Sequence, residues 1–268
     1  MVRTMLEIKN VTKVFNPGTV NEKLALDNFS LTLEDGDFVT VIGGNGAGKS
    51  TMMNAIAGVW PVDEGQIIID GIDVTKLSEH KRAKYLGRVF QDPMTGTAAT
   101  MGIEENLALA KRRGQSRTLR SGITKKEREE YREYLKILGL GLEDRMTSKV
   151  GLLSGGQRQA LTLLMATLQK PKLLLLDEHT AALDPKTAEK VLQTTDLVVN
   201  RDHLTTLMIT HNMRDAIAHG NRLIMLNEGK ITLDIRGEEK QHLTVEDLLH
   251  KFEAASGKEF TNDQAILG

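Results

Sequence analysis

A glycine-rich segment between an apolar run and a helix-forming run constrains the fold of this chain more than any other feature. Its residues are Gly43-Gly44-Asn45-Gly46-Ala47-Gly48-Lys49-Ser50-Thr51. Residues 38–42 before it predict a buried strand, and residues 52–57 after it predict a helix that Gly58 ends. Glycines let backbone N–H groups converge on an anion, and the helix N-terminus adds partial positive charge. A glycine-rich turn can match this pattern by chance, but the flanking strand and helix favour a nucleotide site.

In such a phosphate-binding loop (P-loop), the side chains that follow the glycines have defined tasks. Lys49 reaches the outer phosphates of the nucleotide, and the hydroxyl of Ser50 ligates Mg²⁺. We therefore expect residues 43–51 to bind a nucleotide together with a magnesium ion.

Bulk composition narrows the class of protein. Of the 268 residues, 26% are charged and 40% are apolar, which predicts a folded body of one large or two small domains. The formal net charge of -1 does not indicate a nucleic-acid binder, so we expect no nucleic-acid partner. The absence of cysteine excludes a disulfide scaffold and a thiolate metal site. Because no secretion signal and no apolar run of ~18 residues is found, we expect a cytosolic chain.

Apolar runs along the chain predict strands of two kinds. Loosely alternating residues at 5–15 and an apolar series at 26–33 predict a small β region ahead of the P-loop strand. Continuous apolar runs at 173–176, 205–209 and 222–226 predict strands covered on both faces, and hence a mostly parallel sheet. The expected fold is α/β: a RecA-like P-loop NTPase core with a mostly parallel sheet and a small N-terminal antiparallel β region.

The middle of the chain, about residues 101–145, changes character. Basic residues gather at Lys111-Arg112-Arg113, Arg117, Arg120 and Lys125-Lys126, and apolar positions repeat at helical spacing at Tyr131, Tyr134, Leu135 and Leu138. We expect a helical subdomain, about residues 92–158, inserted between parallel strands of a main domain that covers residues 1–240. Residues 241–268 are expected to form a C-terminal helical tail. The charges of the insertion most simply form a solvated face; a docking face for a partner or for anionic lipid is the alternative.

Two acids follow the leucine run at 173–176, and a histidine follows the run at 205–209. Because ligands of open α/β sheets bind at the carboxyl ends of the strands, Asp177 is placed to hold Mg²⁺ opposite Ser50. Glu178 is a candidate to orient or deprotonate water, although two acids can simply cap a strand. A lone histidine such as His211 is usually structural, but its place makes a γ-phosphate contact plausible.

A second glycine-rich helix start lies at Leu153-Ser154-Gly155-Gly156-Gln157. By the same physics it is a second anion site. The stripe of apolar residues that follows at 161–168 predicts core packing, and Asp184 with Pro185 predicts another helix start. No arginine finger is evident, so the transition-state charge must be met otherwise.

In this order, the motifs resemble those of the ATPase subunits of ABC transporters, over roughly residues 5–235. The matching segments are Walker A at 43–51, Gln91 for the Q-loop, Leu153–Gln157 for the signature, Leu173–Glu178 for Walker B, Ala181–Asp184 for the D-loop with Asp184 as its acid, and His211 for the switch histidine. The resemblance implies that residues 1–240 form an ABC ATPase domain and that ATP and Mg²⁺ are its cofactors.

The resemblance also implies a role for each matching residue. Ser50, Gln91 and Asp177 would attend Mg²⁺. Glu178 would polarise water and His211 would sense the γ-phosphate, so that Glu178, His211 and Gln91 are the expected catalytic residues. Phe15 falls where the family stacks an aromatic ring on adenine, and an ordinary core phenylalanine is the alternative.

The family's working site is built from two chains. By resemblance, the ATP site on the P-loop of one copy would be completed by the signature of a second identical copy, through its residues Ser154, Gly155, Gly156 and Gln157. Gln91 begins the insertion that meets an integral membrane permease in this family. The expected location is therefore the cytoplasmic face of the cell membrane, held there through the permease.

One residue departs from the family pattern. His179 stands where the family usually has proline. The segments 88–93 and 176–184 look most like bacterial uptake systems that are paired with a solute-binding protein or lipoprotein. Some of these are linked to tryptophan or other aromatic amino acids, which makes import of such an amino acid the expected function.

Rival functions remain open at this point. An ABC exporter ATPase would carry the same P-loop. ABC-type ATPases of DNA maintenance separate their two halves by a long coiled coil, whereas Lys49 and Ser154 here lie in one compact chain. A nucleotide-dependent regulatory module is a third possibility, against which an intact Glu178 argues for hydrolysis.

Overall fold

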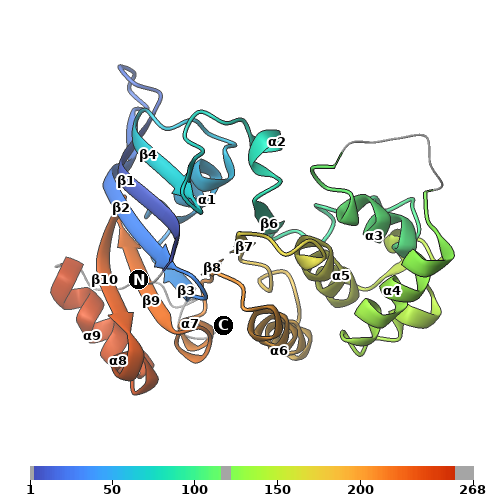
Figure 1. Ribbon diagram of the computed structural model, residues 1–268. Coiled ribbons are helices and arrows are strands. Elements are labelled where there is room, and N and C mark those ends of the chain that lie inside the picture. Colours follow the sequence, from blue (N-terminus) through green and yellow to red (C-terminus); the bar gives the residue numbers. More distant parts are fainter. Residues whose placement is uncertain (1–2, 116–121, 257–268) are drawn as a thin grey trace.

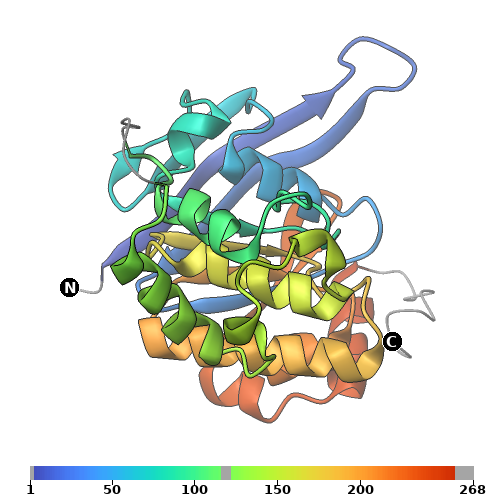
Figure 2. The same cartoon turned by 90° about the vertical axis from the view of Figure 1, so that its right-hand side faces the viewer.

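Two sheets with helices around them form the described part of the chain (Figures 1 and 2). The structure, a computed structural model, describes residues 3–115 and 122–256. Arg117, Arg120 and residues 257–268 of the expected tail lie outside the described residues. No helix within the described ranges is long and apolar enough to cross a membrane.

The central sheet carries the P-loop strand. Within the described residues it has six strands in the order β10-β9-β3-β8-β7-β6. Their bounds are Phe38–Ile42 (β3), Leu86–Val89 (β6), Leu173–Asp177 (β7), Thr206–Ile209 (β8), Arg222–Asn227 (β9) and Lys230–Arg236 (β10). All neighbours are parallel except β9 and β10. The four leucines of β7 are fully buried, as strands covered on both faces require.

A second, antiparallel sheet covers the P-loop helix. Its strand order is β2-β1-β4-β5, with bounds Thr4–Phe15 (β1), Lys23–Glu34 (β2), Glu64–Ile69 (β4) and Ile72–Asp73 (β5). Helix α1 (Lys49–Ala57) and both sheets contribute to one apolar cluster, which includes Met52, Ile56 and Phe29. The predicted α/β core, with its mostly parallel sheet and antiparallel β region, is therefore confirmed.

The helical insertion leaves the sheet after β6 and returns at β7, its parallel neighbour. It contains helices α3 (Ile103–Lys111), α4 (Lys125–Lys136) and α5 (Gly155–Thr167), and the 3-10 turns η1 (Leu142–Asp144) and η2 (Val150–Leu152). In Figure 1, α3 and α4 lie at the right, at the far end from the antiparallel sheet. These elements share an apolar cluster that extends to Leu161 and Leu164 of α5. The inserted helical part is thus confirmed, while its bounds of 92–158 stay a prediction.

Charges of the insertion join its helices. Glu104 on α3, almost fully buried, accepts hydrogen bonds from Nε and Nη2 of Arg128 on α4 at 2.7 and 3.0 Å. Arg112 pairs with Glu127 at 2.9 Å, and Lys111 pairs with Glu130. The basic and acidic runs therefore hold α3 against α4, which the simple interpretation as a solvated face did not include.

An arginine from the basic segment before β6 closes the end of α1. Arg82, at the end of α2 (Glu79–Arg82), is only 1% exposed. Its Nη1 donates to Ala55 O at 2.6 Å and to Ile56 O at 2.8 Å. Because the last carbonyls of a helix have no partner within the helix, this cation satisfies them and matches the negative end of the helix dipole.

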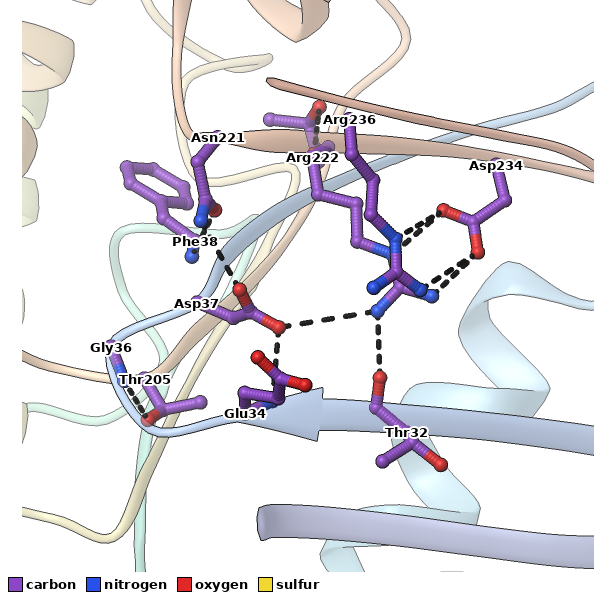
Figure 3. Close-up of polar contacts among 11 residues, drawn as sticks. Thr32, Glu34, Gly36, Asp37, Phe38, Thr205, Asn221, Arg222, Asp234 and Arg236 are labelled. Atoms are coloured by element: carbon purple, nitrogen blue, oxygen red, sulfur yellow. Dashed lines mark hydrogen bonds and ion pairs between the residues drawn. The ribbon is translucent and has the colours of Figure 1, made fainter. Parts of the chain in front are cut away.

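The two sheets are joined by a polar network around Arg222 (Figure 3). The buried Arg222 on β9 donates to both carboxylate oxygens of Asp234 on β10, at 2.7 and 2.6 Å. Its Nη1 donates to Thr32 O on β2 at 2.6 Å. One guanidinium therefore ties the antiparallel sheet to the edge of the central sheet.

The C-terminal helices cover β9 and β10. Helices α6 (Pro185–Asp202) and α7 (Met213–Ala218) follow β7 and β8, and α8 (Gly237–Gln241) and α9 (Val245–Ser256) follow β10. Leu248 and Phe252 of α9 pack in a cluster with Met213 and Ala216 of α7. Within the tail expected at 241–268, the described residues contain α9, a helix of 12 residues.

Candidate functional site

Two glycines of the P-loop lie too close to neighbouring backbone to carry a side chain. Gly43 and Gly48 have φ of +149° and +106°, which L side chains rarely adopt. A Cβ at Gly43 would lie 2.3 Å from Leu226 O, and one at Gly48 would lie 2.7 Å from Ala25 O. The loop is therefore pressed between β9 and β2, and larger residues would push it away from both.

Lys49 is folded onto the loop that precedes it. Its Nζ donates to Gly43 O at 2.6 Å and to Gly44 O at 3.2 Å. Burial lowers the pKa of Lys49, and the nearby carboxylates of Glu178 and Asp177 oppose that shift. A cation with acids beside it is thus placed at the first turn of α1.

A cavity of about 300 Å³ gathers most of the predicted site residues. It is lined by Phe15, Lys23, Ala25, Asn45, Gly46, Ala47, Gly48, Lys49, Ser50, Thr51, Gln91, Glu178 and His211. These residues come from β1 and β2 of the antiparallel sheet, from the P-loop with the start of α1, and from the segments that follow β6, β7 and β8. Lys23 and Ala25 of β2 were not singled out from the sequence, because nothing in β2 marks which residues face the P-loop.

Glu178 and His211 contact each other across the carboxyl ends of two neighbouring strands. His211 Nε2 lies 2.5 Å from Glu178 Oε1, and the side chain of Glu178 is 10% exposed. Glu178 has a left-handed backbone with φ of +47°, and its N–H donates to Ile209 O of β8 at 3.0 Å. This arrangement places an acid and an imidazole side by side at the cavity wall, where each can contact a water molecule or a phosphate oxygen.

Asp177 ends β7 beside an arginine. Burial raises the pKa of Asp177, and Glu178 adds to the rise while Arg88 opposes it. Arg88 Nη2 lies 3.5 Å from Asp177 Oδ2. No role for Arg88 was expected from the sequence, and its pairing follows from the register of β6 against β7, where Arg88 lies opposite Leu175.

Phe15 is half-buried and lines the cavity, so it is not an ordinary core residue. Its ring meets the ring of Trp60 edge-on, with 5.0 Å between centroids. Trp60 was missed in the sequence because it lies 45 positions from Phe15, in the turn after α1. Phe15 offers an aromatic surface at the mouth of the P-loop.

The signature segment lies apart from this cavity. None of Ser154, Gly155, Gly156 and Gln157 is among its lining residues. Ser154 caps α5, accepting a hydrogen bond from Gln157 N at 3.3 Å, while Gln157 Oε1 accepts one from Ser154 N at 3.2 Å. A Cβ at Gly156 would lie 2.0 Å from Thr187 Cγ2, so α5 starts tightly against α6. The structure of one chain does not bring the two predicted anion sites together.

The predicted helix start at Asp184 is also present. Asp184 Oδ1 accepts a hydrogen bond from Thr187 N at 3.1 Å, and Pro185 opens α6. Like the signature, Asp184 does not line the P-loop cavity.

His179 is buried beneath the turn that leaves β7. It is 1% exposed, and its Nε2 lies 3.1 Å from Thr195 Oγ1 on α6. Burial, with a smaller contribution from His219, lowers the pKa of His179 to about 4. The imidazole is therefore neutral at physiological pH.

Comparison with known families decides the identity of this arrangement. A family model described as ABC transporter matches residues 26–181, which include the P-loop, the signature and the acids after β7. The chain belongs to the ABC transporter family. It is one of the family's ATP-binding subunits, which are ATPases coupled to transport.

Curated relatives of this ABC subunit include import-type proteins. The tyrosine transport ATP-binding protein of Clostridioides difficile is 46% identical over 251 residues, which cover 94% of this chain and 100% of the relative. The spermidine/putrescine import ATP-binding protein PotA of Haemophilus ducreyi is 34% identical over 232 residues, 87% of this chain. The chain spans 58% of PotA's length.

Solved structures of ABC cassettes share the fold of this subunit. The cassette MJ0796, in a dimeric post-hydrolysis state bound to ADP and Pi, has a TM-score of 0.73 and 32% identity. The match covers 87% of this chain and 98% of MJ0796. CbiO1 of Clostridium perfringens has a TM-score of 0.75 at 21% identity, over 95% of this chain and 96% of CbiO1, which supports the fold alone.

Proposed function

We propose that two identical copies of this ABC subunit hydrolyse ATP to drive import of an aromatic amino acid, such as tyrosine or tryptophan, through a separate membrane permease. One observation carries the proposal: the P-loop, Gln91, Glu178 and His211 line a single cavity. The likeness to the tyrosine transport ATP-binding protein over its whole length supports the substrate class.

The P-loop cavity suits ATP with a divalent cation. Backbone N–H groups of the P-loop and Lys49 bind the phosphates, and Phe15 stacks on the adenine. The hydroxyl of Ser50, the amide oxygen of Gln91 and the carboxylate of Asp177 are the hard oxygen donors that Mg²⁺ prefers. When bound, Mg²⁺ would neutralise charge on the β- and γ-phosphates.

Glu178 is the general base in this proposal. Its carboxylate accepts a proton from the attacking water, and His211 donates Nε2–H toward the carboxylate or the γ-phosphate. The 2.5 Å contact between the two side chains keeps both groups at the same point of the cavity. Gln91, which follows β6, reports the state of the cavity to the insertion.

A second copy completes the site. Ser154, Gly155, Gly156 and Gln157 stand at the start of α5, outside the P-loop cavity of their own chain, where Gly155 and Gly156 present backbone N–H groups at the helix N-terminus. In a two-fold pair they would close over the ATP of the partner, with Asp184 near the junction. The dimeric form of the relative bound to ADP and Pi supports this assembly.

The permease would dock where the insertion meets the sheet. A groove of about 420 Å³ lies there. Its lining includes Arg88, Asn106, Leu109, Arg113 and Met165. Leu109 is 47% exposed, and Met94, close to Gln91, is 54% exposed. Apolar side chains of this size on an exposed face suit a helix of a partner subunit.

The subunit would then sit at the cytoplasmic face of the membrane, and a solute-binding protein or lipoprotein would deliver the amino acid from the other side.

Within this assembly we propose that residues 1–240 act as the ABC ATPase domain, with the insertion at about 92–158. Residues 241–268 would form an appended tail. Its described part, α9, packs on α7, which begins two residues after His211.

Purification of the tagged chain from membranes tests the assembly, and transport tests the substrate. We expect a permease to co-purify, and the complex in vesicles with its solute-binding protein to take up tyrosine or tryptophan when ATP is supplied. Uptake of a polyamine in place of either amino acid would refute the substrate class. Outward transport of the amino acid would refute import.

A further inference from the structure

The backbone of Glu178 needs support from its surroundings. Its φ of +47° lies in the left-handed region, which a residue with a side chain occupies only when neighbouring contacts hold it there. On the N-terminal side, Glu178 N donates to Ile209 O of β8 at 3.0 Å. On the C-terminal side, Ala181 N donates to Glu178 O at 3.0 Å. The side chain of His179 adds a further contact to this turn.

That contact reaches the third turn of α6. His179 Nε2 lies 3.1 Å from Thr195 Oγ1, and both residues are 1% exposed. The hydroxyl of Thr195 donates to Val191 O at 2.9 Å. Because a hydroxyl has one proton, it accepts from His179, which fixes the imidazole as the tautomer with a proton on Nε2.

The hydrogen bond between His179 and Thr195 joins the two ends of the segment that begins next to Glu178 and continues into α6. The chain runs from β7 through Glu178 and the D-loop into α6, and the His179–Thr195 bond joins that helix back to the residue beside Glu178. A shift of α6 would therefore move His179 and, through one peptide unit, the turn at Glu178. We propose that His179, held by Thr195, is a positioning residue that keeps the Glu178 carboxylate in place for hydrolysis.

This inference rests on the proposed function, because it takes Glu178 as the general base. His179 itself does not line the P-loop cavity, so its effect is on position and not on contact with ATP. A misplacement of a reacting group by a fraction of an ångström lowers turnover without altering the binding of the nucleotide. Turnover and nucleotide affinity are therefore expected to separate.

Helix α6 offers a matched pair of threonines for the test. Thr195→Val removes the acceptor for His179 and keeps the side-chain shape. Thr194→Val is the control, because Thr194 makes the same bond to its own helix, to Lys190 O at 2.8 Å, but is only half-buried and makes no bond to His179. Thr195→Ser restores a hydroxyl at the buried position.

The measurement is the steady-state rate of ATP hydrolysis by the assembled transporter, divided by the concentration of folded sites. Thr195→Val should lower kcat by about tenfold with KM and ATP affinity unchanged, while Thr194→Val and Thr195→Ser stay near the parent. In a Glu178→Gln background, Thr195→Val should have no further effect on the residual rate. A lower melting temperature with unchanged kcat per folded site would overturn the inference, as would an additive effect in the Glu178→Gln background.

The two substitutions distinguish failure of the positioning role from failure of the proposed function. If Glu178→Gln slows turnover and Thr195→Val does not, the inference fails and the proposed function stands. If Glu178→Gln itself leaves turnover unchanged, the base assignment fails, and this inference fails with it.

Discussion

His211 Nε2 lies 2.5 Å from Glu178 Oε1, at the carboxyl ends of two neighbouring parallel strands. The contact joins the acid and the imidazole that follow β7 and β8, and both side chains line the P-loop cavity. The hydrolytic function of this ABC subunit depends on whether that acid receives the proton of water.

Glu178→Gln removes the base and keeps the size of the side chain. Turnover should fall by about 100-fold or more, because general base catalysis contributes that much. ATP affinity should be retained, and ATP should trap a dimer. The exposed Glu189→Gln on α6 is the control, since that acid lines the neighbouring cavity and not the P-loop cavity. Turnover near the parent value for Glu178→Gln would show that another group is the base.

The contact between Phe15 and Trp60 allows nucleotide binding to be followed by tryptophan fluorescence. The chain has one tryptophan, and its ring is 5.0 Å from that of Phe15. ATP should therefore change the fluorescence of Trp60. Phe15→Leu should weaken ATP binding by about threefold to tenfold, the value of one aromatic contact, while Phe15→Tyr should bind as the parent does. Equal affinity for all three chains would exclude stacking of Phe15 on the adenine.

Ser154 is expected to act on the partner's ATP. Ser154→Ala should lower hydrolysis by the assembled complex by about tenfold or more, because it deletes a hydrogen bond to a charged phosphate. ATP affinity of the isolated chain should not change. The substitution also removes the cap of α5, so Thr124→Ala, which removes a cap of the same type from α4, is the control for stability. Equal losses of turnover in both variants would assign the effect to the helix cap.

The Arg222–Asp234 pair predicts a stability effect far from the nucleotide. Asp234→Asn removes the carboxylate that is hydrogen-bonded to the buried Arg222, which keeps only a longer ion pair with Asp37 at 4.0 Å. The substitution should lower the free energy of unfolding by about 2 to 3 kcal/mol. Lys230 lies on the same strand as Asp234 and forms an exposed pair with Asp27 of β2. Lys230→Gln, which breaks that pair, should cost less than about 1 kcal/mol. Urea unfolding at neutral pH measures both, and similar losses would contradict the role of burial.

Lowering the pH should reduce the contribution of Asp234 to the free energy of unfolding over a defined pH range. Partial burial raises the pKa of Asp234, but hydrogen bonds from Arg222 and Arg236 outweigh it and lower the pKa from 3.8 to about 2. A carboxyl with a lowered pKa in the folded state stabilises the fold fully above the unfolded value, and this stabilisation is lost as pH falls through the folded value. The difference between parent and Asp234→Asn should thus be constant from pH 7 to 5 and narrow below pH 4. A difference that narrows near neutral pH would contradict this assignment.

The sequence predicted the parts of the site that local patterns determine. Glycines at 43–48, the acids after the leucine run and the histidine after β8 are each set by their place at a strand end. Because parallel strands end at one edge, Glu178 and His211 could be expected to meet there.

Other features depend on packing between distant elements and left no local mark. The partner of His179 lies 16 positions away on α6, and nothing in the basic residues around Arg82 indicates that this arginine is buried against α1. The pairing of Arg128 with Glu104 needs the relative position of α3 and α4. In the proposed pair the partner of the signature lies on another copy of the chain, so the sequence of one chain indicates it only by resemblance.

The central claim is that each ATP lies between the P-loop of one copy and the signature of the other. To test it, Lys49→Ala chains and Ser154→Arg chains are given different affinity tags and produced together with the permease. Complexes that carry both tags, and therefore contain one chain of each variant, are then isolated. Each such pair has one P-loop and one signature intact, and in a two-fold assembly these face each other in one site. ATP hydrolysis by the doubly tagged pair should reach about half the parent rate, while each variant paired with itself stays inactive. A doubly tagged pair as inactive as its parents would place the whole site within one chain and contradict the account.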